Sequence, residues 1–339
     1  MIESIFPKAL VRKEVYLHRW YALSVFLLII PTLVKLPWAQ TIVSVKSGVT
    51  SPMPWRLQAV QALQQFVDGG ATGSVGIWAA FVVMGYAVML MYSERQRGSL
   101  WYALTTPVSR QQILRVKWCF GFLTLIGVFG LSGLYLFILN SVIHAHIASV
   151  VILTWSVTQV VVETGIFTLT MLIAILVSNP VFALGIGYLL EKLPGMVEWV
   201  LPDAYYRLIF RMPYNWIFLN WQACITPWSF VGRRVDDIQG WLDLSWFLLL
   251  IVLCYAAAQR LFRQMQAERA FALFSLPGMR RWGIGILVAI SGLMVVDVLF
   301  HQVPKSLKIL IFLLFVVCAW RWLVTQFDGA ARKAQRRAQ

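Results

Sequence analysis

Long runs of apolar residues, each about the length needed to cross a lipid bilayer, recur along the chain. A spanning helix needs about 20 mostly apolar residues, because the hydrocarbon core is about 30 Å thick. Only 13% of the residues are charged, against roughly a quarter in an ordinary soluble domain. The candidate spans are residues 20–36, 73–92, 118–139, 149–178, 181–201, 243–263, 282–300 and 306–326. The sequence therefore predicts an all-α polytopic membrane protein with about eight transmembrane helices.

Two of these runs depart from a simple span. The fourth is longer than a bilayer requires, so it tilts, kinks or projects from the membrane. The fifth is interrupted by Glu191, Lys192 and a Pro–Gly pair. The sequence leaves open whether this fifth run crosses the membrane fully.

The net charge of +15 reflects how the chain is oriented in the membrane. Most of the 29 Lys and Arg residues fall in residues 1–19, 93–117, 260–281 and the C-terminal tail, whereas the short turn 140–147 has none. Because short cytoplasmic loops carry an excess of Lys and Arg, both termini are predicted to be cytoplasmic. The basic residues are then expected to contact the headgroups of membrane lipids, and a nucleic-acid partner is not expected.

Residues 1–19 have the periodicity of an amphipathic helix. Lys8, Arg12 and Arg19 cluster on one side. The opposite side carries Ile5, Phe6, Ala9, Leu10, Tyr16, Leu17 and Trp20. This pattern predicts an interfacial helix that leads into the first span. The alternative is a basic start that only sets the topology.

A polar insert, residues 93–117, separates the second and third apolar runs. With one flanking residue on each side it reads YSERQRGSLWYALTTPVSRQQILRVKW. Its first part can continue the preceding helix, and we expect Glu94, Arg95 and Arg97 to face water. A plain solvated connection would tolerate a looser sequence than this one.

The middle of the polar insert contains a sharp break. Pro107 disfavours helical geometry at Thr106 and so ends the first helix. Ser109 followed by Gln112 is a capping-box pattern, which predicts that a second helix starts there and runs into the third span. The sequence therefore predicts two helices that meet at a proline corner and project into the cytoplasm.

Two longer segments are expected on the outer side. In residues 37–71, Leu57, Val60, Leu63 and Phe66 or Val67 recur at helical spacing, which predicts a short helix. Residues 191–242 are rich in aromatic side chains and contain four prolines, which favours short broken helices at the outer leaflet. Such helices could cover the exit of a hydrophobic substrate or simply pack on the membrane surface.

The polar insert resembles the cytoplasmic loop after the second span in ABC type-2 transporter permeases. The resemblance is carried by a Glu a few positions before Gly and Ser, an apolar stretch, the run Pro–Val–Ser–Arg, and a Lys that opens the next span. It implies that this loop is a coupling helix that docks in a groove of a separate ATPase subunit. The residues expected to make that contact are Glu94, Arg97, Gly98, Ser99, Leu100, Leu104, Pro107, Val108, Ser109, Arg110 and Lys117.

The resemblance also implies a domain organisation. Residues 1–19 are similar to the family's interfacial helix, and residues 20–263 to its six-helix core, with the coupling loop at 93–117 and the outer broken helices at 191–242. Residues 264–339 add two further spans and a basic tail. An eight-span form resembles permeases of bacterial antibiotic-response, peptide and bacteriocin-immunity systems, which implies a bacterial cytoplasmic (inner) membrane.

The implied function is ATP-driven export of a hydrophobic or amphipathic compound. The expected assembly contains two ATPase subunits and a second permease, identical or homologous. The chain has no G-x-x-x-x-G-K-[ST] phosphate loop, because the Gly-rich stretch Gly69–Gly76 lacks the lysine. We therefore expect ATP and magnesium to bind to the partner subunit, and this chain to be neither an enzyme nor a carrier of a cofactor.

Two acidic residues fall within apolar runs. Glu163 lies in the middle of the fourth run and Asp297 near the end of the seventh. Ionisable groups in hydrocarbon cost about 2.5–3.5 kcal/mol on insertion scales, so each could contact substrate or a partner span. Alternatively, Glu163 is a carboxyl group bonded to Thr158, Thr164 or a neighbouring helix, and Asp297 lies near the interface with Lys305 or water as its partner. The scattered Cys and His residues predict neither a disulfide framework nor a metal site.

Two other classes of function remain open from the sequence. A secondary transporter driven by an ion gradient predicts paired short, broken spans in corresponding halves, and only the fifth run has this character. A non-transporting scaffold, sensor or immunity subunit is the other alternative.

Overall fold

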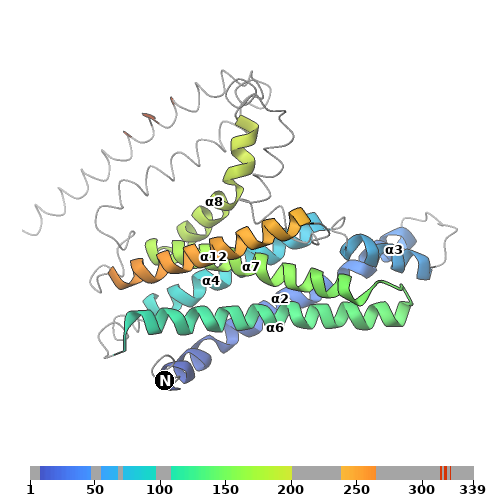
Figure 1. Cartoon of the computed structure of the whole chain (residues 1–339), viewed down its shortest axis with the longest axis horizontal. Coiled ribbons are helices and arrows are strands. Elements are labelled where there is room, and N and C mark those ends of the chain that lie inside the picture. The colour runs from blue at the N-terminus through green and yellow to red at the C-terminus, as the bar shows by residue number, and fades with distance from the viewer. Residues whose placement is uncertain are drawn as a thin grey trace, which may run out of the picture.

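A computed structural model of the chain describes residues 8–46, 55–67, 72–96, 108–200 and 238–264, together with positions 314, 317, 318 and 321. The elements, labelled as in Figure 1, are α2 (Lys8–Lys46), α3 (Trp55–Val67), α4 (Thr72–Gln96), α6 (Arg110–Ile143), α7 (Ser149–Leu176), α8 (Pro180–Val200) and α12 (Ile238–Gln264). Every one is an α-helix, as predicted.

Three of the described helices have the length and apolar composition to cross a membrane: Arg110–Ile143, Ser149–Leu176 and Phe247–Gln264. The chain is thus a helical membrane protein, while the total of eight spans stays a prediction. The seventh and eighth expected spans, at 282–300 and 306–326, lie outside the described residues apart from the four isolated positions.

Helix α7 is the centre of the bundle (Figure 1). It packs against α4, α6, α8 and α12. In its most apolar stretch 72% of the residues are buried, against 44% in α6 and 22% in α12, so α6 and α12 lie at the periphery. Helix α2 runs obliquely across the bundle and packs against α3, α4 and α6, and α8 leaves the bundle at an angle.

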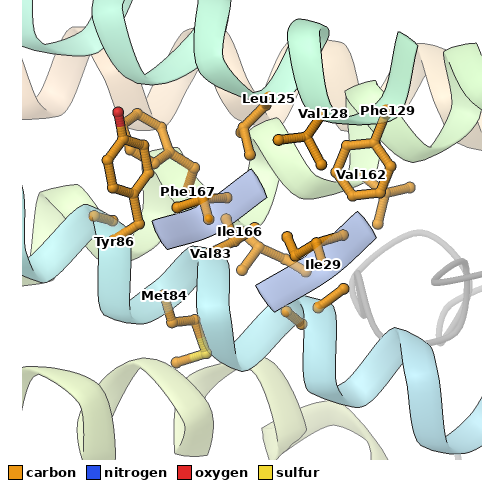
Figure 2. Close-up of a cluster of buried hydrophobic side chains, with 14 of the residues drawn as sticks. Ile29, Val83, Met84, Tyr86, Leu125, Val128, Phe129, Val162, Ile166 and Phe167 are labelled. Atoms are coloured by element: carbon orange, nitrogen blue, oxygen red, sulfur yellow. The ribbon is translucent and has the colours of Figure 1, made fainter. Parts of the chain in front are cut away.

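The core is built where α2, α4, α6 and α7 meet (Figure 2). The labelled side chains there are buried and interdigitate: Ile29, Val83, Met84, Tyr86, Leu125, Val128, Phe129, Val162, Ile166 and Phe167. Because lipid is as apolar as these side chains, helices in a membrane associate through close packing and polar contacts rather than through the hydrophobic effect. Gly121 of α6 provides such a close approach, since a Cβ at this position would collide with the Phe167 ring.

The outer faces of α6, α7 and α12 are apolar as well. Large exposed hydrophobic side chains include Leu123, Leu131, Leu134, Phe137, Leu153, Val252 and Leu253. Exposed apolar surface of this extent is uncommon on a soluble monomer. These faces are therefore suited to contact with lipid rather than with water.

A tight turn joins α6 to α7, as predicted for residues 140–147. The Asn140 side chain closes it, because Nδ2 donates to the Ile147 carbonyl oxygen at 2.9 Å and Oδ1 accepts from the Ile147 N–H at 3.1 Å. His144 and His146 have φ of 52° and 55°. Among residues other than glycine, histidine is one of those enriched in this left-handed region.

Two expectations about local structure need adjustment. The short helix predicted in residues 37–71 is present as α3, but its buried residues are Ala59, Leu63 and Val67, whereas Leu57 is exposed. The Pro–Gly pair in the fifth apolar run does not break the helix, since α8 continues to Val200. Of the predicted outer segment, residues 201–237 lie outside the described residues.

Candidate functional site

The polar insert starts at the end of α4 and finishes in the first turns of α6. Ser109 is the N-cap of α6, because its hydroxyl accepts a hydrogen bond from the Gln112 backbone N–H at 3.2 Å. Gln112 Oε1 accepts one from the Ser109 backbone N–H at 3.0 Å. The predicted capping box is therefore confirmed, and it fixes the residue at which α6 begins.

Two arginines attach the ends of the polar insert to other helices. Buried Arg95, in the last turn of α4, donates to the carbonyl oxygens of Val177 at 3.1 Å and Ile175 at 3.0 Å. Carbonyl groups at a helix C-terminus lack intrahelical donors and carry partial negative charge, so a guanidinium group satisfies them at the end of α7. Arg110 Nη1 donates to the Arg263 carbonyl oxygen at 3.2 Å, near the end of α12.

An ion cluster of five side chains joins the same two ends to α2. Its members are Lys13, Glu14 and His18 of α2, Glu94 of α4 and Lys117 of α6. Lys117 Nζ is 3.0 Å from Glu14 Oε2 and 3.1 Å from Glu94 Oε2. Lys13 Nζ is 2.9 Å from Glu94 Oε1, and His18 Nε2 is 3.1 Å from Glu14 Oε2. All members except Lys13 are buried, with 0% exposure.

The ion cluster is balanced in charge. With His18 neutral it contains two carboxylates and two ammonium groups. The Lys117 ammonium donates to Glu14 Oε2 and to the Leu90 carbonyl oxygen at 3.1 Å, in addition to its ion pair with Glu94. Burying ions costs several kcal/mol each, and good geometry with matched partners is needed to offset that cost. The cluster therefore fixes how α2, α4 and α6 meet.

The protonation states in the ion cluster follow from burial and neighbouring charge. Glu14 and His18 precede the expected first span. Burial opposes the charged form of Glu14, but the Lys117 ammonium and the hydrogen bond from His18 outweigh it and lower the pKa of Glu14 to about 2. Burial lowers the pKa of His18 below its ordinary value, and the Lys117 charge adds to this. A proton on His18 Nδ1 would also lack an acceptor among the described residues.

Three members of the ion cluster have the atoms of a metal site. The ligand atoms of Glu14, His18 and Glu94 lie within 4.8 Å of one another. However, Lys117 Nζ lies 3.0 Å from the Glu14 carboxylate, 3.1 Å from that of Glu94 and 3.4 Å from His18 Nε2. The ammonium group therefore takes the position a metal ion would need, and these residues do not fit a metal.

Within the described residues, the ends of the polar insert and the ion cluster thus hold a concentration of charged and hydrogen-bonded side chains between long apolar helices. Residues 67–193 match the family model of ABC-2 family transporter proteins. No curated protein sequence matches the chain. The ABC-2 domain covers less than half of the chain and contains α4, the polar insert, α6, α7 and the first part of α8.

The ABC-2 domain supplies only part of the ion cluster. Glu94 and Lys117 belong to it, whereas Lys13, Glu14 and His18 come from α2, which precedes it in the chain. The domain therefore reaches its packed arrangement at this corner only together with α2.

The exposure expected for part of the polar insert was wrong. Glu94 and Arg95 were expected to face water, but they are 0% and 3% exposed. Lys117, expected to contact an ATPase, is also fully buried. The reason is that each of these side chains has partners of opposite charge or carbonyl oxygens on a neighbouring helix. The spacing of residues along one helix does not reveal such partners.

Only some of the other residues predicted to contact an ATPase lie among the described residues. Val108 and Arg110 are half-buried and Ser109 is exposed at the start of α6. The predicted contact residues Arg97, Gly98, Ser99, Leu100, Leu104 and Pro107 lie outside the described residues.

The side of the first helix that packs on the rest of the protein differs from the expected apolar side, with which it shares Leu10. The side of α2 that packs on the ABC-2 domain carries Leu10, Glu14, His18 and Val25, whereas Tyr16 is exposed. These four buried residues recur at spacings of four, four and seven, the period of one helix face. This spacing could have predicted from the sequence that Glu14 and His18 are buried. A search for apolar stripes misses it, because two of the four residues are polar or charged.

The intramembrane acidic residues differ in how far they can be placed. Glu163 is fully buried in the middle of α7, next to the buried hydroxyl-bearing residues Thr158 and Thr164. Thr158 donates its own hydroxyl to the Thr154 carbonyl oxygen at 2.8 Å. Asp297 lies outside the described residues.

Proposed function

We propose that this chain is the membrane-spanning permease subunit of an ATP-driven ABC transporter, and that the polar insert couples it to separate ATPase subunits. The observation that carries this proposal is that the ends of the polar insert are attached to three other helices. Arg95 attaches to α7, Arg110 to α12, and Glu94 with Lys117 to α2. A displacement applied to the polar insert would reach these helices directly.

The buried and exposed residues of the polar insert then have different roles. Glu94 and Lys117 act as its base, because their side chains are enclosed by α2, α4 and α6. Contact with the ATPase is assigned to Ser109, Arg110 and the predicted residues between positions 97 and 107. ATP hydrolysis is assigned to the partner, since the chain lacks the glycine-rich phosphate loop with its lysine.

The finer features follow the family resemblance and the composition. We assign the protein to the inner membrane of a bacterium on the family resemblance, and we place both termini in the cytoplasm on the distribution of Lys and Arg. The complex would contain two ATPase subunits and a second permease, and would export a hydrophobic or amphipathic compound. Glu163 is a candidate contact for that compound, because it is a carboxyl group on the central helix of the bundle.

The test is purification of the complex from native membranes, followed by measurement of its ATPase activity. A soluble ATPase should copurify in fixed ratio. Arg110→Gln should lower the ATPase activity of the reconstituted complex while membrane insertion is kept. Arg260→Gln is the matched control, because Arg260 is exposed on the same end of α12. Recovery of the chain alone would favour the ion-driven carrier or the scaffold instead.

A further inference from the structure

The exposed side of the first turns of α2 has a distinct surface, which we name the basic face. Its residues Lys8, Val11, Arg12, Val15, Tyr16 and Arg19 line a hollow of about 450 Å³. Val15 is 45% exposed and Tyr16 69%, so apolar and aromatic groups stand in the open between the cations. This side is opposite to the side of α2 that carries Glu14 and His18.

The charges on the basic face are all positive. Glu14 is the only carboxylate among the described residues of this stretch, and it is buried in the ion cluster. Within the described part of the chain, Arg12 and Arg19 have no ion-pair partner. The guanidinium group of Arg19 lies 4.8 Å from the Tyr16 ring centre and 5.3 Å from that of Trp20. Stacking of this kind orients an arginine while its N–H groups stay available to a phosphate.

The length of α2 places this surface at the membrane boundary. The helix has 39 residues, which corresponds to about 58 Å at 1.5 Å per residue. The hydrocarbon core is about 30 Å thick, and the bilayer with its headgroups about 40–45 Å. The helix must therefore extend into the headgroup layer. The expected first span starts at Trp20, so Arg19 and Trp20 lie where headgroups meet acyl chains.

We propose that the basic face of α2 binds an anionic phospholipid, with its phosphate between Arg12 and Arg19, its glycerol backbone against Val15 and Tyr16, and its acyl chains beyond Trp20. Cations next to exposed aliphatic and aromatic groups match the two parts of such a lipid, a charged headgroup and an apolar chain. The bound lipid would fix the position of α2 at the membrane surface. The opposite side of α2 contacts both ends of the polar insert through the ion cluster. The lipid would thereby set how firmly the polar insert is anchored. This last effect rests on the proposed function, whereas binding of the lipid does not.

Binding is measured by native mass spectrometry on the purified chain with added phosphatidylglycerol or phosphatidylcholine. The wild-type chain should retain phosphatidylglycerol in preference to phosphatidylcholine. Each Lys or Arg in contact with the anionic lipid contributes about a fivefold preference for it, so Arg12→Gln with Arg19→Gln should weaken phosphatidylglycerol retention about 30-fold. The matched control combines Arg260→Gln with Arg321→Gln, both exposed arginines of other segments, and should change retention less than twofold.

Three outcomes would overturn the proposal. The first is equal retention of phosphatidylglycerol by the double variant and the wild-type chain. The second is displacement of the lipid by inorganic phosphate at millimolar concentration, which would make the site one for a free anion. The third is loss of a copurifying protein from the double variant with lipid retention unchanged, which would assign the basic face to a protein partner.

The effect on coupling is read separately. In nanodiscs, ATPase activity of the complex should rise when phosphatidylglycerol replaces phosphatidylcholine, and the double variant should lose this response. If the lipid binds but the activity does not respond, the lipid site stands and only its link to the polar insert is refuted. If no ATPase subunit copurifies, the proposed function fails while the lipid measurement remains valid.

Discussion

Replacing Lys117 with methionine tests whether the ion cluster holds the corner together. The side chain keeps its approximate volume but loses its charge. Glu14 would then lose its buried ammonium partner and keep the neutral His18, while Glu94 would keep its ion pair with Lys13, whose side chain is 40% exposed. Removing one partner of a buried ion pair costs about 3–5 kcal/mol, because the remaining charge is left uncompensated. We expect Lys117→Met to lower the free energy of unfolding by about this amount.

The assay is unfolding of the purified chain in mixed micelles of increasing SDS content, followed by circular dichroism. Adding Glu14→Gln to Lys117→Met leaves one carboxylate, Glu94, with one ammonium group, Lys13. The second substitution should therefore cost nothing further or restore part of the lost stability, so that the two changes are strongly non-additive. Lys13→Met is the control and should cost about 1 kcal/mol or less, because Lys13 is 40% exposed and Glu94 keeps its ion pair with Lys117. The reasoning would be refuted if the losses in the free energy of unfolding were additive. It would also be refuted if Lys117→Met cost no more than Lys13→Met.

Two further predictions concern pH and packing. Glu14 and His18 both have lowered pKa values in the folded chain, so the unfolded chain binds more protons at low pH. The free energy of unfolding therefore falls as the pH falls, first below 6.5 through His18 and then below 4.5 through Glu14. His18→Gln should remove most of the stability difference between pH 7.5 and 5.5 in the same SDS titration, and an unchanged pH dependence would argue against a neutral buried histidine. Gly121→Ala should cost about 1–3 kcal/mol because its Cβ collides with the Phe167 ring, whereas Gly130→Ala, which meets open space, should change stability by less than about 0.5 kcal/mol. Equal effects of the two alanines on thermal stability in detergent would contradict the packing at Gly121.

The features that depend only on residues close together in the sequence, such as helix caps and turns, were predicted from the sequence. Ser109 and Gln112 form the expected capping box, because both partners lie within one helical turn. The turn between α6 and α7 also falls where polar residues separate two apolar runs, with Asn140 closing it through its own side chain. Such features are set by a few adjacent residues, so one sequence is enough to find them.

The ion cluster depends on distant residues and could not be predicted in the same way. Glu94 and Arg95 look like a solvated helix end, since charged residues usually are exposed. Their burial follows from Lys117, from α2 and from the end of α7, and no rule about spacing along the chain brings these together. The face of Leu10 and Val25 was likewise obscured, because Glu14 and His18 occupy the same helix side.

The order in which the chain is synthesised gives the ion cluster a further consequence. Lys117 follows Glu14 by 103 residues, and Glu94 is 81 residues after Lys13. When α2 first enters the membrane, the Glu14 carboxylate therefore lacks Lys117, and Lys13 lacks Glu94. An unpaired carboxylate is costly in hydrocarbon, so the first turns of α2 must remain hydrated during this interval. Final docking of α2 therefore waits for α4 and α6, so this corner is completed only after Lys117 has been made.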